Sequence, residues 1–550
     1  MKRLALLPPL AFLACEAPFS FPTPVATVTV SPPTAEIHQG DSVQLSATLR
    51  DSAGLVLTDR TVFWSSSDPG RVYVSAAGLV VGLDAGSATI AARAEGATGE
   101  AAVRVTFRVA AVTVDQGDFT LVPGGTLQLS ATPHDPGGNP LGGRATSWSS
   151  GDPSVLRVSP TGSVEALAEG AATLTATVEG VSGSITVRVE RLAFVSVSAS
   201  ELHHTCGRTS DGRVACWGLN NLGQLGLAAV ARSTSSVAAA RAPRFAEVTT
   251  GAAFTCGRTT TGQVYCWGSA ARGRLGTGSL ANTPYAGLVP LTQPLLTLSS
   301  GWNHTCGVGP DGRGYCWGEF PQVGNYPSPV ARTPVPVLGE LAYDEIAAGE
   351  GFTCGIASDS LAHCWGTNLS SRLGVESQQQ SVEPLPVSGG LHFTTITTAG
   401  VHACGLTETG DAYCWGGNVF GELGAGVGTL NTSAHPQPVA GGIAFRAIAG
   451  GANTSCALTP TGAAYCWGKN DAGQLGAPTT DLCNGIPCSR TPLAVSGGLQ
   501  FAAISVGDQH SCGVTAGESL VYCWGKNDAG QLGDGTLTDR AVPTRVAGQR

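Results

Sequence analysis

Cys206-Gly-Arg-Thr-Ser-Asp-Gly-Arg-Val-Ala-Cys216 decides the fold, because close variants of this stretch recur through the last two-thirds of the chain. The segment Ser210-Asp-Gly212 is typical of a three-residue hairpin loop whose glycine takes a left-handed conformation. A hairpin with this loop places Cys206 directly opposite Cys216. Opposed residues in a non-hydrogen-bonded pair have Cα atoms about 4.5 Å apart, and a disulfide spans that distance. We therefore expect the two cysteines to be bonded across the hairpin.

The same unit returns every 48–56 residues, and each second cysteine is followed by Trp-Gly. Many units continue into an Asn and a Gly-x-Leu-Gly segment, as in Asn470-Asp-Ala-Gly-Gln-Leu-Gly476. A period near fifty in turn-rich β sequence is typical of propeller blades. The expected pairs are Cys206–Cys216, Cys256–Cys266, Cys306–Cys316, Cys354–Cys364, Cys404–Cys414, Cys456–Cys466 and Cys512–Cys523.

Each of these disulfides closes a short loop, which stabilises the blade by about 2.5–3 kcal/mol on the chain-entropy model. Cys483 and Cys488 lie in an insertion of the sixth unit and predict a small stapled loop. Buried free thiols are the alternative for the repeated pairs, and the expected export to an oxidising compartment disfavours them. Isolated cysteine pairs also lack the further ligands that zinc requires. Of the 17 cysteines, only Cys15 then has no partner.

These repeats resemble the regulator-of-chromosome-condensation repeat, which carries the motifs Cys-Trp-Gly-x-Asn-x-x-Gly-Gln-Leu-Gly and Gly-x-x-His-Thr-Cys-Gly. The resemblance implies a seven-bladed β-propeller over residues 192–550. It also implies the family's best-known role, guanine-nucleotide exchange on a nuclear small GTPase. Most units have a Pro-Val strand before the cysteine hairpin, but the first does not. We therefore expect the spare strand Pro543-Thr-Arg-Val546 to complete the first blade and remove an open edge.

Two similar modules precede the repeats. Phe63-Trp-Ser-Ser-Ser-Asp-Pro69 in the first corresponds to Ser147-Trp-Ser-Ser-Gly-Asp-Pro153 in the second. Alternating apolar segments between regularly spaced turns are typical of β-sandwiches, and the motifs resemble the bacterial immunoglobulin-like group 2 family. We expect sandwiches over residues 25–107 and 108–190, with the two tryptophans in their cores. A stalk is favoured over an adhesin, because the aromatic residues stand at core positions.

The fold class expected for the whole chain is therefore all-β, with two immunoglobulin-like β-sandwiches followed by a seven-bladed β-propeller. Glycine (76) and proline (33) are abundant and only 13% of residues are charged, as expected for many short strands and turns. The formal net charge of −9 gives no basic footprint for nucleic acid.

The N-terminus has the pattern of an export signal. Met1-Lys-Arg3 is positive, and Leu4 to Ala14 is apolar but too short to span a membrane. Phe12-Leu-Ala-Cys15 resembles a bacterial lipobox, although Phe12 replaces the usual leucine. We expect residues 1–15 to be a signal peptide, Cys15 to carry a lipid, residues 16–24 to be a tether, and the protein to reach the cell envelope or surface. An ordinary signal peptide with an incidental Cys15 is the alternative.

Histidine recurs two residues before the first cysteine, at His204, His304, His402 and His510. Four histidines near a propeller axis raise the alternative of a metal site, as in some propeller lyases. The equivalent residues in other units are Phe254, Phe352 and Thr454, which favours a packing role. The sequence has no nucleophile motif or spaced ligand set, so we expect neither catalysis nor a cofactor.

The third unit departs from the repeat. It has Glu319-Phe-Pro-Gln-Val-Gly-Asn-Tyr326 in place of the Asn and Gly-x-Leu-Gly segment, and Trp302 precedes its first cysteine. Departures from a repeat often mark interaction loops, so Trp302, Glu319, Phe320 and Tyr326 form a candidate binding loop; neutral drift is the alternative.

The function expected is that of an exported, non-enzymatic monomer whose propeller binds another macromolecule, a protein rather than nucleic acid. Its membrane contact is through the N-terminal lipid alone. The alternatives are nucleotide exchange, a metal-dependent lyase, and enzyme inhibition, since a secreted bacterial β-lactamase inhibitor has a similar propeller.

Overall fold

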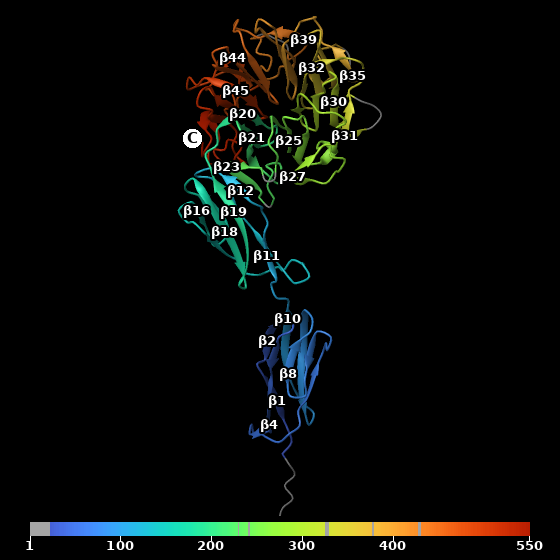
Figure 1. Cartoon of the computed structure of the whole chain (residues 1–550), viewed down its shortest axis with the longest axis vertical. Coiled ribbons are helices and arrows are strands. Elements are labelled where there is room, and N and C mark those ends of the chain that lie inside the picture. The colour runs from blue at the N-terminus through green and yellow to red at the C-terminus, as the bar shows by residue number, and fades with distance from the viewer. Residues whose placement is uncertain are drawn as a thin grey trace, which may run out of the picture. The chain divides into compact units, whose positions relative to one another are not determined.

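The computed structural model describes residues 23–228, 230–239, 242–324, 329–376, 379–426 and 431–549. The expected signal peptide, Cys15, most of the tether and Tyr326 lie outside these residues. Within them, every regular element is a strand except two single-turn 3₁₀ helices, η1 (Ala271–Gly273) and η2 (Leu369–Ser371). No described helix has the length and apolar character needed to cross a membrane. The expectation of an all-β chain is confirmed (Figure 1).

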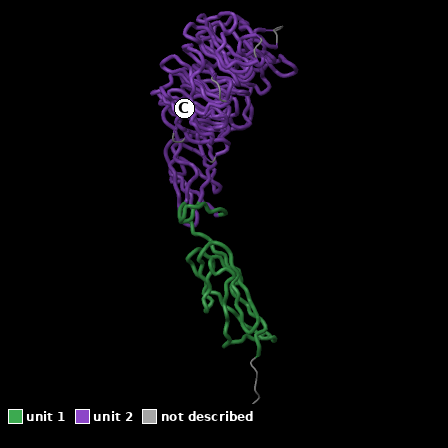
Figure 2. The backbone as a smooth tube through the Cα atoms, turned by 90° about the vertical axis from the view of Figure 1, so that its right-hand side faces the viewer, with its two compact units in different colours: residues 1–111, 133–143 green, residues 112–132, 144–550 purple. Residues whose placement is uncertain are grey.

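The chain divides into two compact units (Figure 2). One contains residues up to Ala111 together with Pro133–Gly143, and the other contains Val112–Thr132 and Arg144–Arg550. Most of the second immunoglobulin-like module therefore belongs to the same unit as the propeller.

The first module is a sandwich built from short strands. Its three sheets have the orders β1-β4-β5, β2-β10-β9-β6 and β3-β8-β7. Val80, Ile90 and Val103 lie in its core, and Trp64 packs against them. The strands are β1 (Thr27–Ser31), β2 (Thr34–His38), β3 (Ser42–Gln44), β4 (Ser46–Arg50), β5 (Val56–Leu57), β6 (Phe63–Ser66), β7 (Val72–Val74), β8 (Leu79–Gly82), β9 (Gly86–Ala94) and β10 (Ala97–Thr106).

The second module repeats this pattern. Its long hairpin β18–β19 pairs with β15 on one side and with β12 on the other. The strands are β11 (Ala111–Val114), β12 (Phe119–Leu121), β13 (Thr126–Gln128), β14 (Ala131–His134), β15 (Ser147–Ser150), β16 (Leu156–Val158), β17 (Ser163–Ala166), β18 (Gly170–Val178) and β19 (Val181–Val189).

Seven antiparallel blades follow, each with an inner strand, a cysteine hairpin and an outer strand. The first four are β20 (Phe194–Ala199), β21 (His204–Thr209), β22 (Val214–Leu219), β23 (Arg232–Ala238); β24 (Glu247–Thr250), β25 (Phe254–Arg258), β26 (Val264–Gly268), β27 (Thr283–Leu288); β28 (Ser299–Ser300), β29 (His304–Val308), β30 (Gly314–Glu319), β31 (Val330–Pro336); and β32 (Tyr343–Ala348), β33 (Phe352–Ala357), β34 (Ala362–Thr367), β35 (Gln380–Pro386). The last three are β36 (Thr395–Thr398), β37 (His402–Leu406), β38 (Ala412–Gly417), β39 (Thr432–Pro438); β40 (Ala447–Gly450), β41 (Thr454–Leu458), β42 (Ala464–Lys469), β43 (Leu482–Cys483), β44 (Ile486–Ala494); and β45 (Phe501–Val506), β46 (His510–Thr515), β47 (Val521–Gly525), β48 (Arg540–Arg545).

In blades 1 to 6 the hairpins have the register that a three-residue loop imposes, and the seventh keeps its cysteines opposed with one more loop residue. Cys206 lies opposite Cys216, and Gly212 has a φ of +82°. In all seven blades the two cysteines form a disulfide, with Cα atoms 4.0–4.1 Å apart. Cys483 and Cys488 form an eighth disulfide at the start of the outer strand of blade 6.

The expected closure of the ring by a shared strand is wrong. The C-terminal strand β48 pairs with β47 inside the seventh blade, and the first blade has four consecutive strands of its own. The proline-containing strand is thus the last strand of its own blade, not the first strand of the next. Because it lies between two hairpins in the sequence, its position alone does not say which hairpin it joins.

The outer edge of the first blade differs from the other six. The outer strands of blades 2 to 7 all contain proline, which removes a backbone donor and blocks pairing with another chain. Strand β23 has none. Strand β12 of the second module lies against it instead, with Leu121 opposite Val237, so that one sheet runs from the module into blade 1. The module therefore covers an edge that the sequence leaves unprotected.

Val122 completes this junction. It is fully buried in a cluster with Leu192, Trp217 and Val546 of the propeller. Close by, Leu192 forms a parallel bridge with Gln549, so the first and last residues of the propeller lie side by side next to Val122. In the first module the residue equivalent to Val122 is the polar His38. The second module, which packs on the propeller, thus has an apolar residue where the first module has a polar one.

We expect Val122→Asp to destabilise the second unit by about 3 kcal/mol, because it removes a buried apolar side chain and buries an unpaired charge. The matched change His38→Asp in the first module should leave this unit unchanged. Urea denaturation followed by tryptophan fluorescence measures both variants. Equal, small effects of the two substitutions would contradict the docking described above.

Candidate functional site

The two ends of the propeller axis differ in the loops that surround them. Turns between the first and second strands of each blade, together with the loops after the third strands, lie at one end, which we call the turn face. The cysteine hairpin loops and the connections between blades lie at the other end, the hairpin face. This follows from the antiparallel order of the strands.

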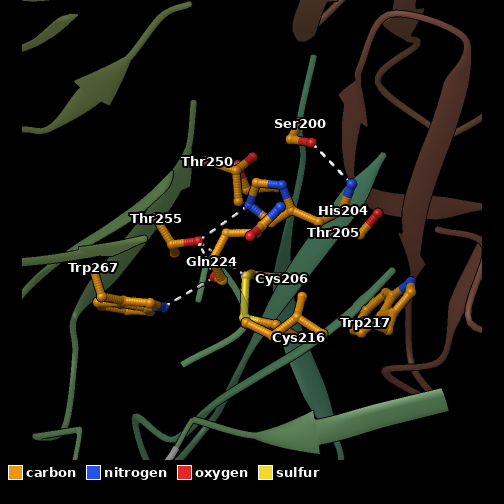
Figure 3. The surroundings of a disulfide bond; sticks show 12 residues. Ser200, His204, Thr205, Cys206, Cys216, Trp217, Gln224, Thr250, Thr255 and Trp267 are labelled. Atoms are coloured by element: carbon orange, nitrogen blue, oxygen red, sulfur yellow. Dashed lines mark hydrogen bonds between the residues drawn. A yellow bond between two sulfur atoms is a disulfide. The ribbon is translucent and has the colours of Figure 1, made fainter. Parts of the chain in front are cut away.

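The four repeated histidines bind neighbouring blades to one another. His204 Nε2 lies 3.1 Å from Thr255 Oγ1 in the next blade, beside the Cys206–Cys216 disulfide (Figure 3). The same contact joins His304 to Thr353, His402 to Ser455 and His510 to Thr205, at 2.6–2.8 Å. In the described residues no group of three or more His, Cys, Asp or Glu is placed to hold a metal ion.

The hydrogen bonds of the threonine and serine hydroxyls determine which nitrogen of each histidine ring carries the proton. Thr255 Oγ1 donates its only hydrogen to the carbonyl oxygen of Gln224 at 2.9 Å, so His204 must donate from Nε2. The Nδ1 atoms of His304 and His402 are buried without a hydrogen-bond partner among the described residues. Burial lowers the pKa of His204 to about 4 and those of His304, His402 and His510 to about 3. These imidazoles are neutral structural groups.

The repeated tryptophans reach the same carbonyl groups. Trp267 Nε1 donates to the carbonyl oxygen of Gln224 at 3.0 Å (Figure 3). All seven tryptophans make the equivalent bond to the preceding blade, at 2.8–3.2 Å. All seven are fully buried.

Two of the three blades without histidine use another pair at this position. Phe254 and Phe352 lie under the guanidinium groups of Arg274 and Arg372, at 5.8 and 5.1 Å from the ring centres. These arginines occupy the place of Gln224 in the repeat. After the Phe352 blade, the hydroxyl position of the next blade is Ala403. Both phenylalanines are thus accompanied by an arginine, which explains why the position accepts phenylalanine, whereas the hydroxyl of the next blade is kept after Phe254, as Thr305.

At the turn face the seven turns approach closely around the axis. A Cβ atom at Gly301 would collide with the carbonyl oxygen of Gly349, and one at Gly451 with that of Gly507. The backbone N–H of Glu350 donates to the carbonyl oxygen of Ala399 at 3.2 Å. The turns thus form a ring of backbone that narrows the axis at this end.

Three turns carry a carboxylate, which we name the axis acids: Glu201, Glu350 and Asp508, from blades 1, 4 and 7. Burial, and then the charges of Glu350 and Asp508, raise the pKa of Glu201 to about 8. Burial also raises the pKa values of Glu350 and Asp508. Sequence reasoning missed these residues, since they are up to 307 positions apart and stand in the turns of separate blades; the position of Glu350 and Asp508 is Trp302 in blade 3 and Ala or Gly in blades 2, 5 and 6.

Inside the ring the axis holds a polar cavity of about 200 Å³. Hydroxyls of the inner strands line it and link the blades, as where Ser198 Oγ accepts the N–H of Thr250. Glu201 and Glu345 also line it. Burial raises the pKa of Glu345 to about 7.

The structure brings together the described members of the candidate binding loop. Trp302 stands in the blade 3 turn, Glu319 is the last residue of the third strand β30 and Phe320 follows it, so all three belong to the turn face. Asn303 Nδ2 donates to Glu319 at 2.7 Å, and Arg272 of blade 2 forms an ion pair with Glu319. The Cys483–Cys488 loop also follows a third strand, so it lies on the same face.

Family comparisons agree with this architecture. The model of the bacterial Ig-like domain (group 2) matches residues 24–105 and 108–189. Two models of the regulator of chromosome condensation (RCC1) repeat match residues 194–224, 245–274, 400–422, 445–474 and 501–531, and residues 261–308, 461–514 and 518–550. The chain is an RCC1-repeat protein with two group 2 bacterial Ig-like domains. These matches to the RCC1 repeat omit residues 309–399, which hold most of the irregular third blade and all of the fourth.

The curated relatives that this chain matches share only a part of their length with it. Human E3 ubiquitin-protein ligase HERC2 is 41% identical over 99 residues, which are 18% of this chain and 2% of HERC2. The ultraviolet-B receptor UVR8 of Arabidopsis thaliana is 36% identical over 107 residues, which are 19% of this chain and 23% of UVR8.

Solved RCC1-type propellers superpose on this one. Prp20p from Saccharomyces cerevisiae, with 21% identity and a TM-score of 0.56, covers 64% of this chain and 87% of its own. Human WBSCR16, with 18% identity and a TM-score of 0.52, covers 61% and 92%. At these identities the likeness shows the fold alone.

We expect His304→Phe to change how stability depends on pH. An unfolded histidine takes up a proton below about pH 6.5, whereas folded His304 does so only near pH 3, so the wild type loses stability as pH falls through this window. Within that window, the free energy of unfolding of the variant should fall by about 1.4 kcal/mol less per pH unit than that of the wild type. At pH 7.5 the variant should be less stable than the wild type by about 1 kcal/mol, because the hydrogen bond of His304 is lost.

Denaturant midpoints between pH 7.5 and 4.5 test this expectation. His435→Phe, at a surface histidine whose side chain is 56% exposed, is the control and should keep the wild-type slope. A wild-type slope in His304→Phe would show that His304 is not the neutral group inferred above.

Proposed function

We propose that this protein is an exported, non-enzymatic binding protein whose turn face holds another protein. The observation that carries the proposal is the gathering of irregular features on one face. The third-blade residues Trp302, Glu319 and Phe320, the Cys483–Cys488 loop and the axis acids all belong to it. Loops that depart from a repeat on a rigid scaffold are the usual place for recognition.

Solved relatives support protein binding as the class of function. The structure of Prp20p is described together with its binding to Gsp1p and histones, and a further structure has yeast RCC1 (Prp20) bound to Kap60. Gsp1p, histones and Kap60 are partners of Prp20. For this chain, export would place cytosolic GTPases out of reach, so we propose a partner among secreted or surface proteins.

The N-terminal part of the proposal is an anchor and a spacer. The Phe12-Leu-Ala-Cys15 segment supports lipid attachment at Cys15, and eight disulfides support an oxidising compartment. Because the second Ig-like module belongs to the propeller unit, the tether and the first module would supply the spacing from the membrane.

The face is tested by placing a photo-crosslinking amino acid at position 302 on the turn face, or at Glu408 in a hairpin loop on the other face. Each purified protein is exposed to secreted and surface proteins of the source cells, and crosslinked species are identified by mass spectrometry. We expect a discrete partner from position 302 only.

In a second experiment the crosslinker is moved to position 320, which leaves position 302 free for the substitution Trp302→Ala. This substitution should reduce capture of the partner by tenfold or more, as expected for a buried aromatic contact of about 1.5–3 kcal/mol. Glu408→Ala in the same background is the control. Capture from position 408 alone, or none from either position, contradicts the proposal.

A further inference from the structure

One end of the first Ig-like module holds the point where the described chain enters the sandwich. The Val25 N–H donates to Glu95 Oε2 at 3.0 Å, at the turn between β9 and β10. Thr27 lies opposite Arg50, the last residue of β4. Arg60, between β5 and β6, forms an ion pair with Glu95. We name this region the entry end; it comprises residues 23–27, 50–63 and 93–97.

Three large apolar side chains of the entry end are exposed. Leu55, Val56 and Phe63 are 68%, 55% and 69% exposed. Their neighbours Leu57 and Val62 pack against the core of the module. Strands β5 and β6 are edge strands of two different sheets, and only residues 58–62 join them. The three exposed side chains therefore lie at the same end and along the same side of the sandwich.

The second module has the same turn without these apolar side chains. Asp51 Oδ1 accepts the N–H of Leu55 at 2.9 Å, and Asp135 Oδ1 accepts that of Asn139 at 2.9 Å. An identical backbone turn thus forms whether its tip is apolar or polar. At the positions of Leu55, Val56 and Phe63 the second module has Asn139, Pro140 and Ser147. The apolar side chains are not needed to build the sandwich, so they point to a contact outside the module.

An exposed arginine lies opposite two of the apolar residues. Arg50 pairs with Val56 across β4 and β5, and Arg93 pairs with Phe63 across β9 and β6. Neither arginine has an ion-pair partner among the described residues. At these two positions the second module has a histidine and a threonine. Apolar side chains beside guanidinium groups, which bond phosphate bidentately, suit the boundary between lipid tails and headgroups.

The size and place of this patch favour a membrane over a protein partner. Three side chains of this size expose roughly 300–400 Å², well short of the roughly 800 Å² that each partner of a stable dimer buries. Cys15, the expected lipid site, precedes Val25 by ten positions. A fully extended chain of that length spans at most about 36 Å. A membrane that holds the lipid is therefore within reach of the entry end.

We propose that the entry end of the first module docks on the lipid surface, with Leu55, Val56 and Phe63 among the headgroups and Arg50 and Arg93 bonded to lipid phosphates. This inference rests on the lipid anchor of the proposed function and adds a second membrane contact, made by the protein itself. Residues 50–63 and 93–97 contain three arginines and three acidic residues, so their formal charges balance. Apolar insertion drives the contact, and zwitterionic lipid suffices.

Photo-crosslinking to lipid tests the docking. A photo-crosslinking amino acid is placed at position 56, or at the matched position 140 of the second module. The full chain is reconstituted with phosphatidylcholine vesicles that carry a trace of alkyne-tagged phosphatidylcholine. We expect lipid adducts at position 56 and at most a tenth as many at position 140. Equal labelling at the two positions, no labelling at position 56, or crosslinked dimers in place of lipid adducts would overturn the docking.

The second module supplies matched substitutions for a further arm. With the crosslinker at position 56, Leu55→Asn combined with Phe63→Ser should reduce lipid adducts tenfold or more, because two apolar side chains no longer enter the lipid. Leu79→Ser, at an exposed leucine outside the entry end, is the control and should leave the adducts unchanged. Thermal unfolding confirms that the variants fold. Undiminished adducts in the double variant would overturn the docking.

The docking and the lipid anchor fail separately. Mass spectrometry of the purified chain shows whether Cys15 carries a lipid. A chain without that lipid that still forms adducts at position 56 would refute the anchor and keep the docking. A lipid-carrying chain that forms no adducts there would refute the docking and keep the anchor.

Discussion

The register of the cysteine hairpin is the constraint on which the propeller depends. With Cys206 opposite Cys216, Thr205 lies opposite Trp217, and both donate to the carbonyl oxygen of Gln531 in the preceding blade, at 2.9 Å each. A slip of one residue would turn every side chain of the hairpin to the other face of the sheet. The disulfide removes that alternative, and the tryptophan bond is repeated in all seven blades around the ring.

The contacts between blades form a chain of donors and acceptors. At all seven interfaces a buried carbonyl oxygen accepts a tryptophan N–H. At four of them it also accepts a threonine or serine O–H, whose oxygen accepts a histidine N–H from the blade before it. At the closure of the ring, His510 and Thr205 make this contact between the last blade and the first. The ring therefore closes through side chains as well as through the Leu192–Gln549 bridge, and the second Ig-like module covers the edge that remains on blade 1.

Much of this fold can be predicted from the sequence because it is written in local patterns. The hairpin loop, the spacing of the cysteines and the Trp-Gly step each act within about a dozen residues, and their repetition gives the number of blades. The strand Pro543–Val546 could not be assigned from local patterns, because sequence order does not tell which of two flanking hairpins an outer strand pairs with. Val122 was also missed, although comparison with His38 in the first module shows the apolar change.

The candidate site could be predicted only in part. Trp302, Glu319 and Phe320 stand out because they break a repeat, and the structure adds that they share a face with the Cys483–Cys488 loop. The axis acids give no such signal. Glu201, Glu350 and Asp508 look like ordinary turn residues in three separate blades, and only the closed ring brings their carboxylates together.

Peptide mapping of the native protein under non-reducing conditions tests the hairpin register most directly. The account predicts seven bridged peptides within blades, Cys206–Cys216 through Cys512–Cys523, and an eighth joining Cys483 to Cys488. Free thiols at the blade cysteines, or bridges between different blades, would contradict it.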